Sequence, residues 1–269
     1  MSKHINIAVA GCAGRMGRQL VSVGRASGHA ITGGSEVAGS AAIGRDIGTL
    51  AGLEPIGVTC AADLNAAARG ASVWIDFTVP AATLSALEQL PAAGAKAAII
   101  GTTGFTPEED ARIQAAAEKL VIVKAGNFSL GVNLLEALVR QAAASLGPDW
   151  DIEVLETHHR HKVDAPSGTA LMLGDAAAEG RGRPLSELRA APYEGGEAKR
   201  VPGEIGFSVR RSGGVIGDHE VTLSSEREIV SLRHTALDRA VFAQGAIKAA
   251  EWAMDQTPGL YDMTDVLGV

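Results

Sequence analysis

The segment "INIAVAGCAGRMG" (residues 5–17) decides how the first half of the chain folds. Residues 5–11 are mostly apolar and typical of a buried strand, and Gly11, which ends this run, is followed by Gly14 and Gly17. In a strand–turn–helix unit, Gly11 permits the tight turn, Gly14 lets the backbone approach a pyrophosphate, and Gly17 lets helix and strand pack closely. The amides that open the following helix can bind phosphates. The segment therefore predicts a dinucleotide-binding unit, although a plain strand–helix turn can carry similar glycines.

Two other features strengthen this prediction and bear on the choice of cofactor. Glu36 ends the second predicted strand, where an acidic side chain can bind the ribose hydroxyls of a dinucleotide. The sequence "GTTG" (residues 101–104) ends the fourth predicted strand, and ligands of open α/β sheets bind beyond the carboxyl ends of the strands. The 2′-phosphate of NADP usually meets an arginine near the ribose-binding acid, but here Val37 follows Glu36 and the first basic residue is Arg45. The sequence therefore favours NADH over NADPH.

Short apolar strands alternate with alanine-rich helices through residues 5–126. The strands carry no strict polar alternation, as expected when helices cover both faces of a sheet. Pro80 and Pro107 suit the first turn of a helix, and Thr106 suits the N-cap. We expect an α/β fold with a Rossmann-like, doubly wound parallel sheet. The predicted strands span residues 5–11, 30–36, 71–78, 96–103 and 120–126, and the predicted helices span residues 15–25, 81–90 and 107–119.

The pattern changes after about residue 127, which predicts a second, α+β domain. A long helix ends at Gly147-Pro148, and a strand with alternating polarity follows it. The last predicted helix is long enough to fold back on the first domain. In order, we expect a helix at 131–147, a strand at 151–159, a helix at 167–179, an extended loop at 180–203, antiparallel strands within 204–214 and 219–236, and a helix at 238–254.

The composition excludes several classes of protein. The formal net charge of −7 and the 4% of aromatic residues argue against nucleic acid or an anionic membrane surface as the main partner. Cys12 and Cys60 form no disulfide framework, which indicates a reduced setting. The N-terminal residues do not resemble a signal peptide, and no apolar run approaches the roughly 18 residues of a membrane span. We therefore expect a soluble, cytoplasmic protein.

A second informative segment is "ETHHRHKVDAPSGTA" (residues 156–170), which contains His158, His159 and His161. A zinc site normally requires three or four converging ligands. No cysteine and no H-E-x-x-H motif lies nearby, and Asp164 is the only close carboxylate downstream. We therefore expect no metal site. Taken alone, the histidines also fit a polar strand end with exposed imidazoles.

The residues that follow the histidines favour a catalytic role. Residues 166–169 read as the start of a helix, where free amides can bind a carboxylate. Lys162 adds a positive charge for a second carboxylate or a developing anion. Hydride addition to C=N or C=C leaves an anion that must be protonated, and a histidine that titrates near neutrality is a natural proton donor. The segment therefore predicts a site that holds a small acid while a reduced nicotinamide delivers hydride to it.

The motifs "GCAGRMG", "IDFT", "IGTTGF", "NFSLGVN" and above all "HHRHKVDAPSGTA" resemble the 4-hydroxy-tetrahydrodipicolinate reductase (dihydrodipicolinate reductase) family over essentially the whole chain. The resemblance implies an oxidoreductase of lysine and diaminopimelate biosynthesis that reduces 4-hydroxy-tetrahydrodipicolinate, a small dicarboxylate, to tetrahydrodipicolinate with NADH or NADPH. It also implies a homotetramer. The dinucleotide-binding domain would span residues 1–129 and be completed by a C-terminal helix at 239–269, and a substrate-binding and tetramerisation domain would span residues 130–238.

The resemblance also implies roles for individual residues. His158 would donate the proton with the assistance of Lys162. His159 would contact the substrate, and Ser167, Gly168 and Thr169 would bind one of its carboxylates. His161 receives no role. The cofactor would be lined by Gly11, Cys12, Ala13, Gly14, Arg15, Met16, Glu36, Gly101, Thr102, Thr103, Ala125, Gly126, Asn127 and Phe128. Many relatives carry an arginine where this chain has Val37, which again places a preference for NADP in doubt.

Two other functions fit a dinucleotide-binding chain less well. An acylating aldehyde dehydrogenase would need a nucleophilic cysteine in the second half, but both cysteines precede residue 61. A regulator that senses NAD would need a DNA-binding or partner-binding domain, and none is visible in the sequence. It would also leave His158 and Lys162 without a purpose.

Overall fold

The computed structural model describes residues 4–196 and 198–269. The chain divides into two compact units. Unit 1 contains the residues up to Ser129 together with Ala240–Gly268, and unit 2 contains Leu130–Arg239 together with Val269. No helix in the described part of the chain is both long enough and apolar enough to cross a membrane.

Unit 1 is built on a six-stranded sheet of order β10-β5-β4-β3-β1-β2, in which every neighbouring pair is parallel. This arrangement confirms the predicted doubly wound sheet. Strand β10 interrupts the segment that was predicted as a C-terminal helix at 239–269, because a strand of three residues is too short to show a periodic pattern. The strands are β1 (Asn6–Ala10), β2 (Ala30–Ser35), β3 (Val73–Asp76), β4 (Ala97–Ile100), β5 (Val121–Lys124) and β10 (Gly259–Tyr261).

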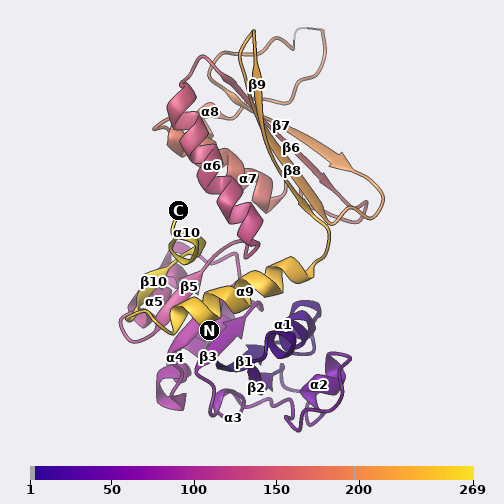
Figure 1. The fold of residues 1–269 in the computed structure, drawn as a ribbon, viewed down its shortest axis with the longest axis vertical. Coiled ribbons are helices and arrows are strands. Elements are labelled where there is room, and N and C mark those ends of the chain that lie inside the picture. The colour runs from indigo at the N-terminus through magenta and orange to yellow at the C-terminus, as the bar shows by residue number, and fades with distance from the viewer. Residues whose placement is uncertain (1–3, 197) are drawn as a thin grey trace. The chain divides into compact units, whose positions relative to one another are not determined.

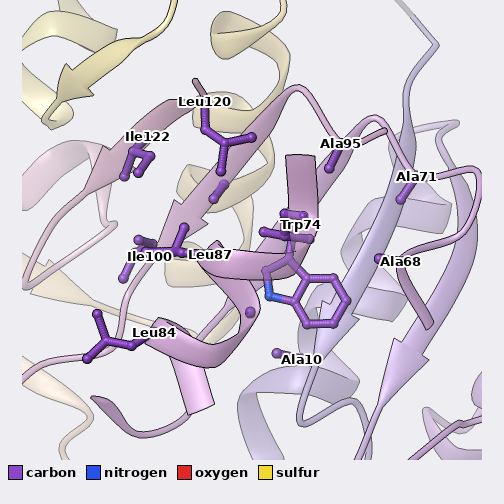
Figure 2. Packing of buried hydrophobic residues seen from close by; sticks show 14 of the residues in the cluster. Ala10, Ala68, Ala71, Trp74, Leu84, Leu87, Ala95, Ile100, Leu120 and Ile122 are labelled. Atoms are coloured by element: carbon purple, nitrogen blue, oxygen red, sulfur yellow. The ribbon is translucent and has the colours of Figure 1, made fainter. Parts of the chain in front are cut away.

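Helices cover both faces of this sheet (Figure 1). On one face, α3 (Leu64–Ala68), α4 (Pro80–Ala93) and α5 (Pro107–Ala116) pack over a continuous apolar cluster. Figure 2 shows the centre of this cluster, where Trp74 of β3 lies beneath α4. On the other face, α1 (Arg15–Ala26) packs against α9 (Ala240–Ala253). Two short helices complete the unit, α2 (Ile47–Leu50) and α10 (Met263–Leu267).

The helix starts in unit 1 follow the expected chemistry. Thr106 is the N-cap of α5, and its hydroxyl accepts a hydrogen bond from the Glu109 amide while the Glu109 carboxylate accepts one from the Thr106 amide. Pro107 and Pro80 occupy the first turns of α5 and α4, where a missing N–H costs nothing. These starts confirm the predicted positions of both prolines and of the cap.

Unit 2 packs two helices on one face of a four-stranded sheet of order β7-β6-β8-β9 (Figure 1). Alternate residues of β6 are buried, and Ile152 and Val154 pack with Leu173 in the core of this unit. Glu156 and His158 continue the same buried face towards the end of the strand. The elements are α6 (Leu130–Leu146), β6 (Asp151–His158), α7 (Gly168–Gly180), α8 (Leu185–Leu188), β7 (Ile205–Arg211), β8 (Gly217–Ser224) and β9 (Ile229–Ala236).

The pairing of β7 corrects one prediction. Strands β8 and β9 are antiparallel, as expected, but β7 runs parallel to β6. The reason is that α7 and the segment after it carry the chain back to the beginning of β6, which makes a β–α–β crossover. Arg200 anchors this return, because its guanidinium donates hydrogen bonds to the carbonyls of Ile152 and Glu204. The segment predicted as an extended loop also contains the short helix α8.

Candidate active site

The glycine loop between β1 and α1 has the geometry of a phosphate cradle. Gly11 adopts a left-handed conformation with φ of 58°, and the Gly14 amide donates a hydrogen bond to the Gly11 carbonyl. A Cβ atom at Gly17 would lie 2.1 Å from the Gly11 carbonyl oxygen, so only glycine lets α1 pack this closely on the loop. Gly14 caps α1 without a side-chain hydrogen bond, which leaves the first amides of the helix available to a ligand.

The Glu36 carboxylate lies beside this loop. Its Oε1 accepts a hydrogen bond from the Ala13 amide at 3.0 Å, and its Oε2 accepts one from the Val37 amide at 3.3 Å. Glu36, Val37 and Gly11 line a cavity of about 540 Å³, together with Asp76 and Thr78 at the carboxyl end of β3. An acid that is already oriented at the rim of a cavity next to a glycine loop fits the ribose and phosphates of a dinucleotide.

A network of buried hydroxyl groups joins the ends of β3 and β4. Asp76 is buried and accepts hydrogen bonds from the backbone amide and hydroxyl of Thr78 and from the Thr102 hydroxyl. Burial raises the pKa of Asp76, and the hydrogen bonds from Thr78 and Trp74 offset part of that rise. The Thr102 hydroxyl also accepts hydrogen bonds from the Thr78 amide and the Thr83 hydroxyl. The network therefore holds in place the turn that contains "GTTG".

The other residues expected near the cofactor differ in exposure. Cys12 and Phe128 have buried side chains, so only their backbone atoms can reach a ligand. The Cys12 thiol lies 3.4 Å from the Cys60 thiol, and burial raises the pKa of both. Of the remaining residues, Arg15, Thr103 and Gly126 are exposed, and Met16, Gly101, Ala125 and Asn127 are partly buried. Contact of these residues with a cofactor stays a prediction.

In unit 2, the side chains of Glu156 and His158 lie together at the end of β6. His158 Nδ1 lies 2.5 Å from Glu156 Oε2. Arg211, at the end of β7, donates one hydrogen bond to each oxygen of the same carboxylate, at 2.8 and 2.9 Å. The Ser167 amide donates a further bond to Oε1 at 3.0 Å. Three donors and the Nδ1 atom of His158 therefore surround one fully buried carboxylate.

These donors keep Glu156 ionised inside the unit. Burial is the largest influence on its pKa and opposes ionisation, but the hydrogen bonds from Arg211, His158 and the Ser167 amide together lower the pKa below its usual range. In turn, the bond to Glu156 raises the pKa of Arg211. The negative charge next to His158 is therefore permanent over the physiological pH range.

A second buried imidazole, His219 of β8, packs edge-on against His158 with ring centroids 5.0 Å apart. Its Nε2 lies 3.1 Å from the Ser167 hydroxyl. Burial, reinforced by the nearby His158, lowers the pKa of His219 to about 4. His219 is therefore neutral near pH 7 and shapes the site without adding charge.

The burial of His219 predicts a loss of stability in acid. The unfolded chain protonates this histidine below about pH 6.5, whereas the folded chain resists protonation until about pH 4. The contribution of buried, neutral His219 to the free energy of unfolding is therefore complete above about pH 6.5. It falls by on the order of 3 kcal/mol as the pH is lowered to about 4. Denaturant unfolding of His219→Gln between pH 7.5 and pH 4 should show a weaker dependence on pH than the wild type. An unchanged dependence would contradict this account, and the exposed His161→Gln serves as the control.

The segment after β6 leads to the start of α7. Lys162 Nζ pairs with Asp164 Oδ1 at 2.9 Å, which lowers the pKa of Asp164. Ser167 caps α7 by accepting a hydrogen bond from the Ala170 amide. Gly168 is exposed, and no atom lies within 4 Å of the position that its Cβ would take, so the helix start is open to a ligand. Thr169 follows it and is partly buried.

His159 and His161 lie beyond the end of β6, so the alternation of the strand does not govern them. Their ring centroids are 6.2 Å apart. His161 is exposed, whereas His159 is partly buried and its Nδ1 is enclosed. Desolvation, followed by the charge of Arg239, lowers the pKa of His159.

The sequence analysis missed three residues of this site: Glu156, Arg211 and His219. The signal for Glu156 was present, because an acid at a position that continues the buried face of a strand needs a partner. The other two lie on strands that are distant in the sequence, and no local pattern marks them.

Comparison with known proteins places the chain in a family. The model described as "Dihydrodipicolinate reductase, N-terminus" matches residues 5–128, and the model described as "Dihydrodipicolinate reductase, C-terminus" matches residues 131–267. The 4-hydroxy-tetrahydrodipicolinate reductase of Parvibaculum lavamentivorans is 51% identical, with 100% of both chains covered. The enzyme of that name from Caulobacter vibrioides is 49% identical and covers 100% of this chain and 99% of its own.

Solved structures show the same fold. The dipicolinate-bound dihydrodipicolinate reductase from Paenisporosarcina sp. TG-14 superposes with a TM-score of 0.78 at 24% identity, covering 98% of this chain and 99% of its own. An amine dehydrogenase from Mycobacterium smegmatis superposes with a TM-score of 0.66 at 15% identity, covering 96% and 94%. Together with the match over both halves of the sequence, the comparisons show that the chain belongs to the dihydrodipicolinate reductase family.

Proposed function

We propose that the protein reduces 4-hydroxy-tetrahydrodipicolinate to tetrahydrodipicolinate with NADH or NADPH, as a step of lysine and diaminopimelate biosynthesis. The observation that carries this proposal is the combination, within residues 158–169, of a buried imidazole, an ammonium group and an open helix start. Relatives that are about half identical over their whole length and bear the name of this enzyme support it.

Unit 2 would bind the substrate. A carboxylate would accept hydrogen bonds from the amides of Gly168 and Thr169 at the start of α7, where the helix dipole also favours negative charge. The second carboxylate would take the place of Asp164 beside Lys162, because both are anions that need the same ammonium group. His159 would contact the substrate from the turn that follows β6. The two carboxylates would orient the reacting carbon.

Unit 1 would bind the cofactor through the glycine loop, Glu36 and the turn at residues 101–103. When bound, the reduced nicotinamide supplies a hydride. His158 would supply the proton, and the hydroxyl group of the substrate would leave as water, so that atoms and charges balance. Glu36 would hold a ribose through its carboxylate oxygens, and the amides of residues 13–16 would hold the phosphates.

The family resemblance further supports a cytoplasmic homotetramer, in which unit 2 also carries the tetramer contacts. The apolar side chains of Val209 on β7 and Ile229 on β9 are exposed on the single chain and are candidates for such contacts. Sedimentation of the purified protein at several concentrations would test this assembly.

The direct test of function is an assay of the purified protein with freshly prepared 4-hydroxy-tetrahydrodipicolinate. We expect loss of NADH absorbance that depends on this substrate, with formation of tetrahydrodipicolinate. An aldehyde and a monocarboxylic amino acid serve as control substrates, because neither offers two carboxylates to the site. Failure to oxidise NADH or NADPH with the dicarboxylate would refute the proposed function.

The choice between cofactors is a separate prediction. Val37 is 75% exposed beside Glu36, where it offers no charge to a 2′-phosphate. We therefore expect kcat/KM with NADH to equal or exceed kcat/KM with NADPH. Val37→Arg should raise kcat/KM with NADPH by roughly 10- to 100-fold, since a hydrogen bond to a charged group contributes about 1.5–3 kcal/mol. Val37→Gln adds length without charge and is the control. A strong preference of the wild type for NADPH would show that this argument is wrong.

A further inference from the structure

We infer that Glu156, clamped by Arg211 and the Ser167 amide, is a positioning residue that fixes the tautomer of His158 and makes Nε2 the atom that gives up the proton. This inference rests on the proposed function, because it deepens the role given there to His158. It adds two side chains on different strands, neither of which contacts the substrate in the proposed binding mode.

The clamp leaves the Glu156 carboxylate no rotational freedom. Glu156 Oε2 faces Arg211 and His158 Nδ1, and Oε1 faces Arg211 and the Ser167 amide. Three of these four contacts come from groups that can only donate, two from Arg211 and one from the Ser167 amide. Together with His158 they outweigh the effect of burial and lower the pKa of Glu156, so the carboxylate is ionised.

The carboxylate in turn fixes which ring nitrogen of His158 carries hydrogen. An ionised carboxylate accepts hydrogen bonds and donates none, so His158 Nδ1 must carry a hydrogen in both the neutral and the protonated ring. The proton that the ring can gain and lose is therefore on Nε2. Among the described residues, no hydrogen bond to Nε2 is formed. Beside it lies Gly217 of β8, where a Cβ would come within 3.2 Å of Nε2. A glycine here leaves the donor atom uncovered.

An amide in place of the Glu156 carboxylate should change the tautomer of His158. In Glu156→Gln, the NH₂ group must replace one oxygen. At the Oε1 position it would oppose Arg211 and the Ser167 amide, which are both obligatory donors. At the Oε2 position it would oppose Arg211 and His158 Nδ1, of which the imidazole alone can become an acceptor. The amide therefore favours the second orientation and inverts the tautomer of His158. If the His158 ring were protonated, its Nδ1–H would face the N–H of the introduced amide. This repulsion disfavours the protonated ring, so His158 no longer acts as a proton donor.

The experiment measures the tautomer directly. ¹⁵N spectra of histidine-labelled protein report which ring nitrogen carries hydrogen, and His158→Gln assigns the signals. With the pH raised until the His158 signals no longer change, we expect the Nδ1–H form of His158 in the wild type and the Nε2–H form in Glu156→Gln. An Nε2–H form in the wild type, or an unchanged Nδ1–H form in the variant, would overturn the inference.

Kinetics of the same variants give a second readout. In Glu156→Gln we expect kcat to fall by roughly 10²–10⁴-fold, the usual contribution of a general acid, because the proton donor is lost, while KM for NADH stays within about twofold. Arg211→Lys keeps the charge but loses one arm of the clamp, so we expect Nδ1–H to persist and kcat to fall by roughly tenfold. Unchanged kcat in both variants would overturn the inference.

Glu220→Gln is the matched control for these variants. Glu220 lies on β8 next to His219, so it points away from the buried face of the sheet, and we expect no change in tautomer or kcat. If Glu156→Gln does not fold, Arg211→Lys carries the kinetic test alone. If the wild type shows no reductase activity, the proposed function fails, and the ¹⁵N spectra still decide whether Glu156 sets the tautomer.

Discussion

Replacing His158 by glutamine is expected to lower kcat for 4-hydroxy-tetrahydrodipicolinate reduction by roughly 10²–10⁴-fold, the usual contribution of a general acid. Glutamine can still donate a hydrogen bond to Glu156, but it has no proton to give up. The predicted cofactor residues all lie in unit 1, whereas His158 lies in unit 2, so KM for NADH should not change. Steady-state kinetics with the two substrates varied separately would measure both effects.

Two companion variants sharpen this prediction. Lys162→Ala removes the ammonium group that now pairs with Asp164, so we expect KM for the dicarboxylate to rise and kcat to fall. His161→Gln changes an exposed histidine of the same segment that has no proposed role, so we expect wild-type kinetics. Values of kcat close to the wild type in both His158→Gln and Lys162→Ala would contradict the assignment of the active site to this segment.

The fold of unit 1 could be predicted because local patterns determine it. The central strands β3, β4 and β5 are almost entirely buried, and α4 and α5 begin at residues with capping or first-turn chemistry. The glycine loop follows from sterics, since the close approach of α1 to Gly11 permits no side chain at Gly17. The short elements α2, α3, α8 and β10 were missed because they offer too few residues for a periodic pattern.

The candidate site of unit 2 was predicted only in part. The segment from His158 to Thr169 is continuous in sequence, so its chemistry can be read directly. The clamp on Glu156 cannot, because Arg211 reaches it through the parallel register that pairs β6 with β7. The sequence pattern suggested antiparallel strands there. Nothing local distinguishes a strand that pairs with its predecessor from one that returns through a crossover.

The cofactor region shows the same division. Glu36 could be identified from its place at the end of β2, but the buried network of Asp76, Thr78 and Thr102 depends on how two loops meet in space. The Thr102 hydroxyl is bonded to Asp76, Thr78 and Thr83, and contact of Thr102 with the cofactor stays a prediction. A polar residue after a strand can bind a ligand or can bond to its neighbours in the fold, and the sequence alone does not distinguish these two roles.

Replacing Gly17 by alanine is expected to damage both stability and cofactor use. The new Cβ would lie 2.1 Å from the Gly11 carbonyl oxygen and 2.7 Å from Cys12 Cα. Both are backbone atoms, so α1 or the loop must shift. Overpacking of this kind costs about 1–3 kcal/mol of unfolding free energy. We also expect kcat/KM with NADH to fall by roughly 10²-fold, because a displacement of about 1 Å in groups that position a reactant can cost that much.

Gly24→Ala is the matched control, since it makes the same change in the same helix. Its Cβ would approach the Cδ1 atom of Ile31 at 3.0 Å, and that flexible side-chain end can move aside. Alanine also favours a helix interior over glycine by about 1 kcal/mol. We therefore expect Gly24→Ala to keep wild-type kcat/KM and at least wild-type stability. If Gly17→Ala behaved in the same way, the loop would tolerate a side chain, and the argument that this glycine holds α1 against a phosphate cradle would fail.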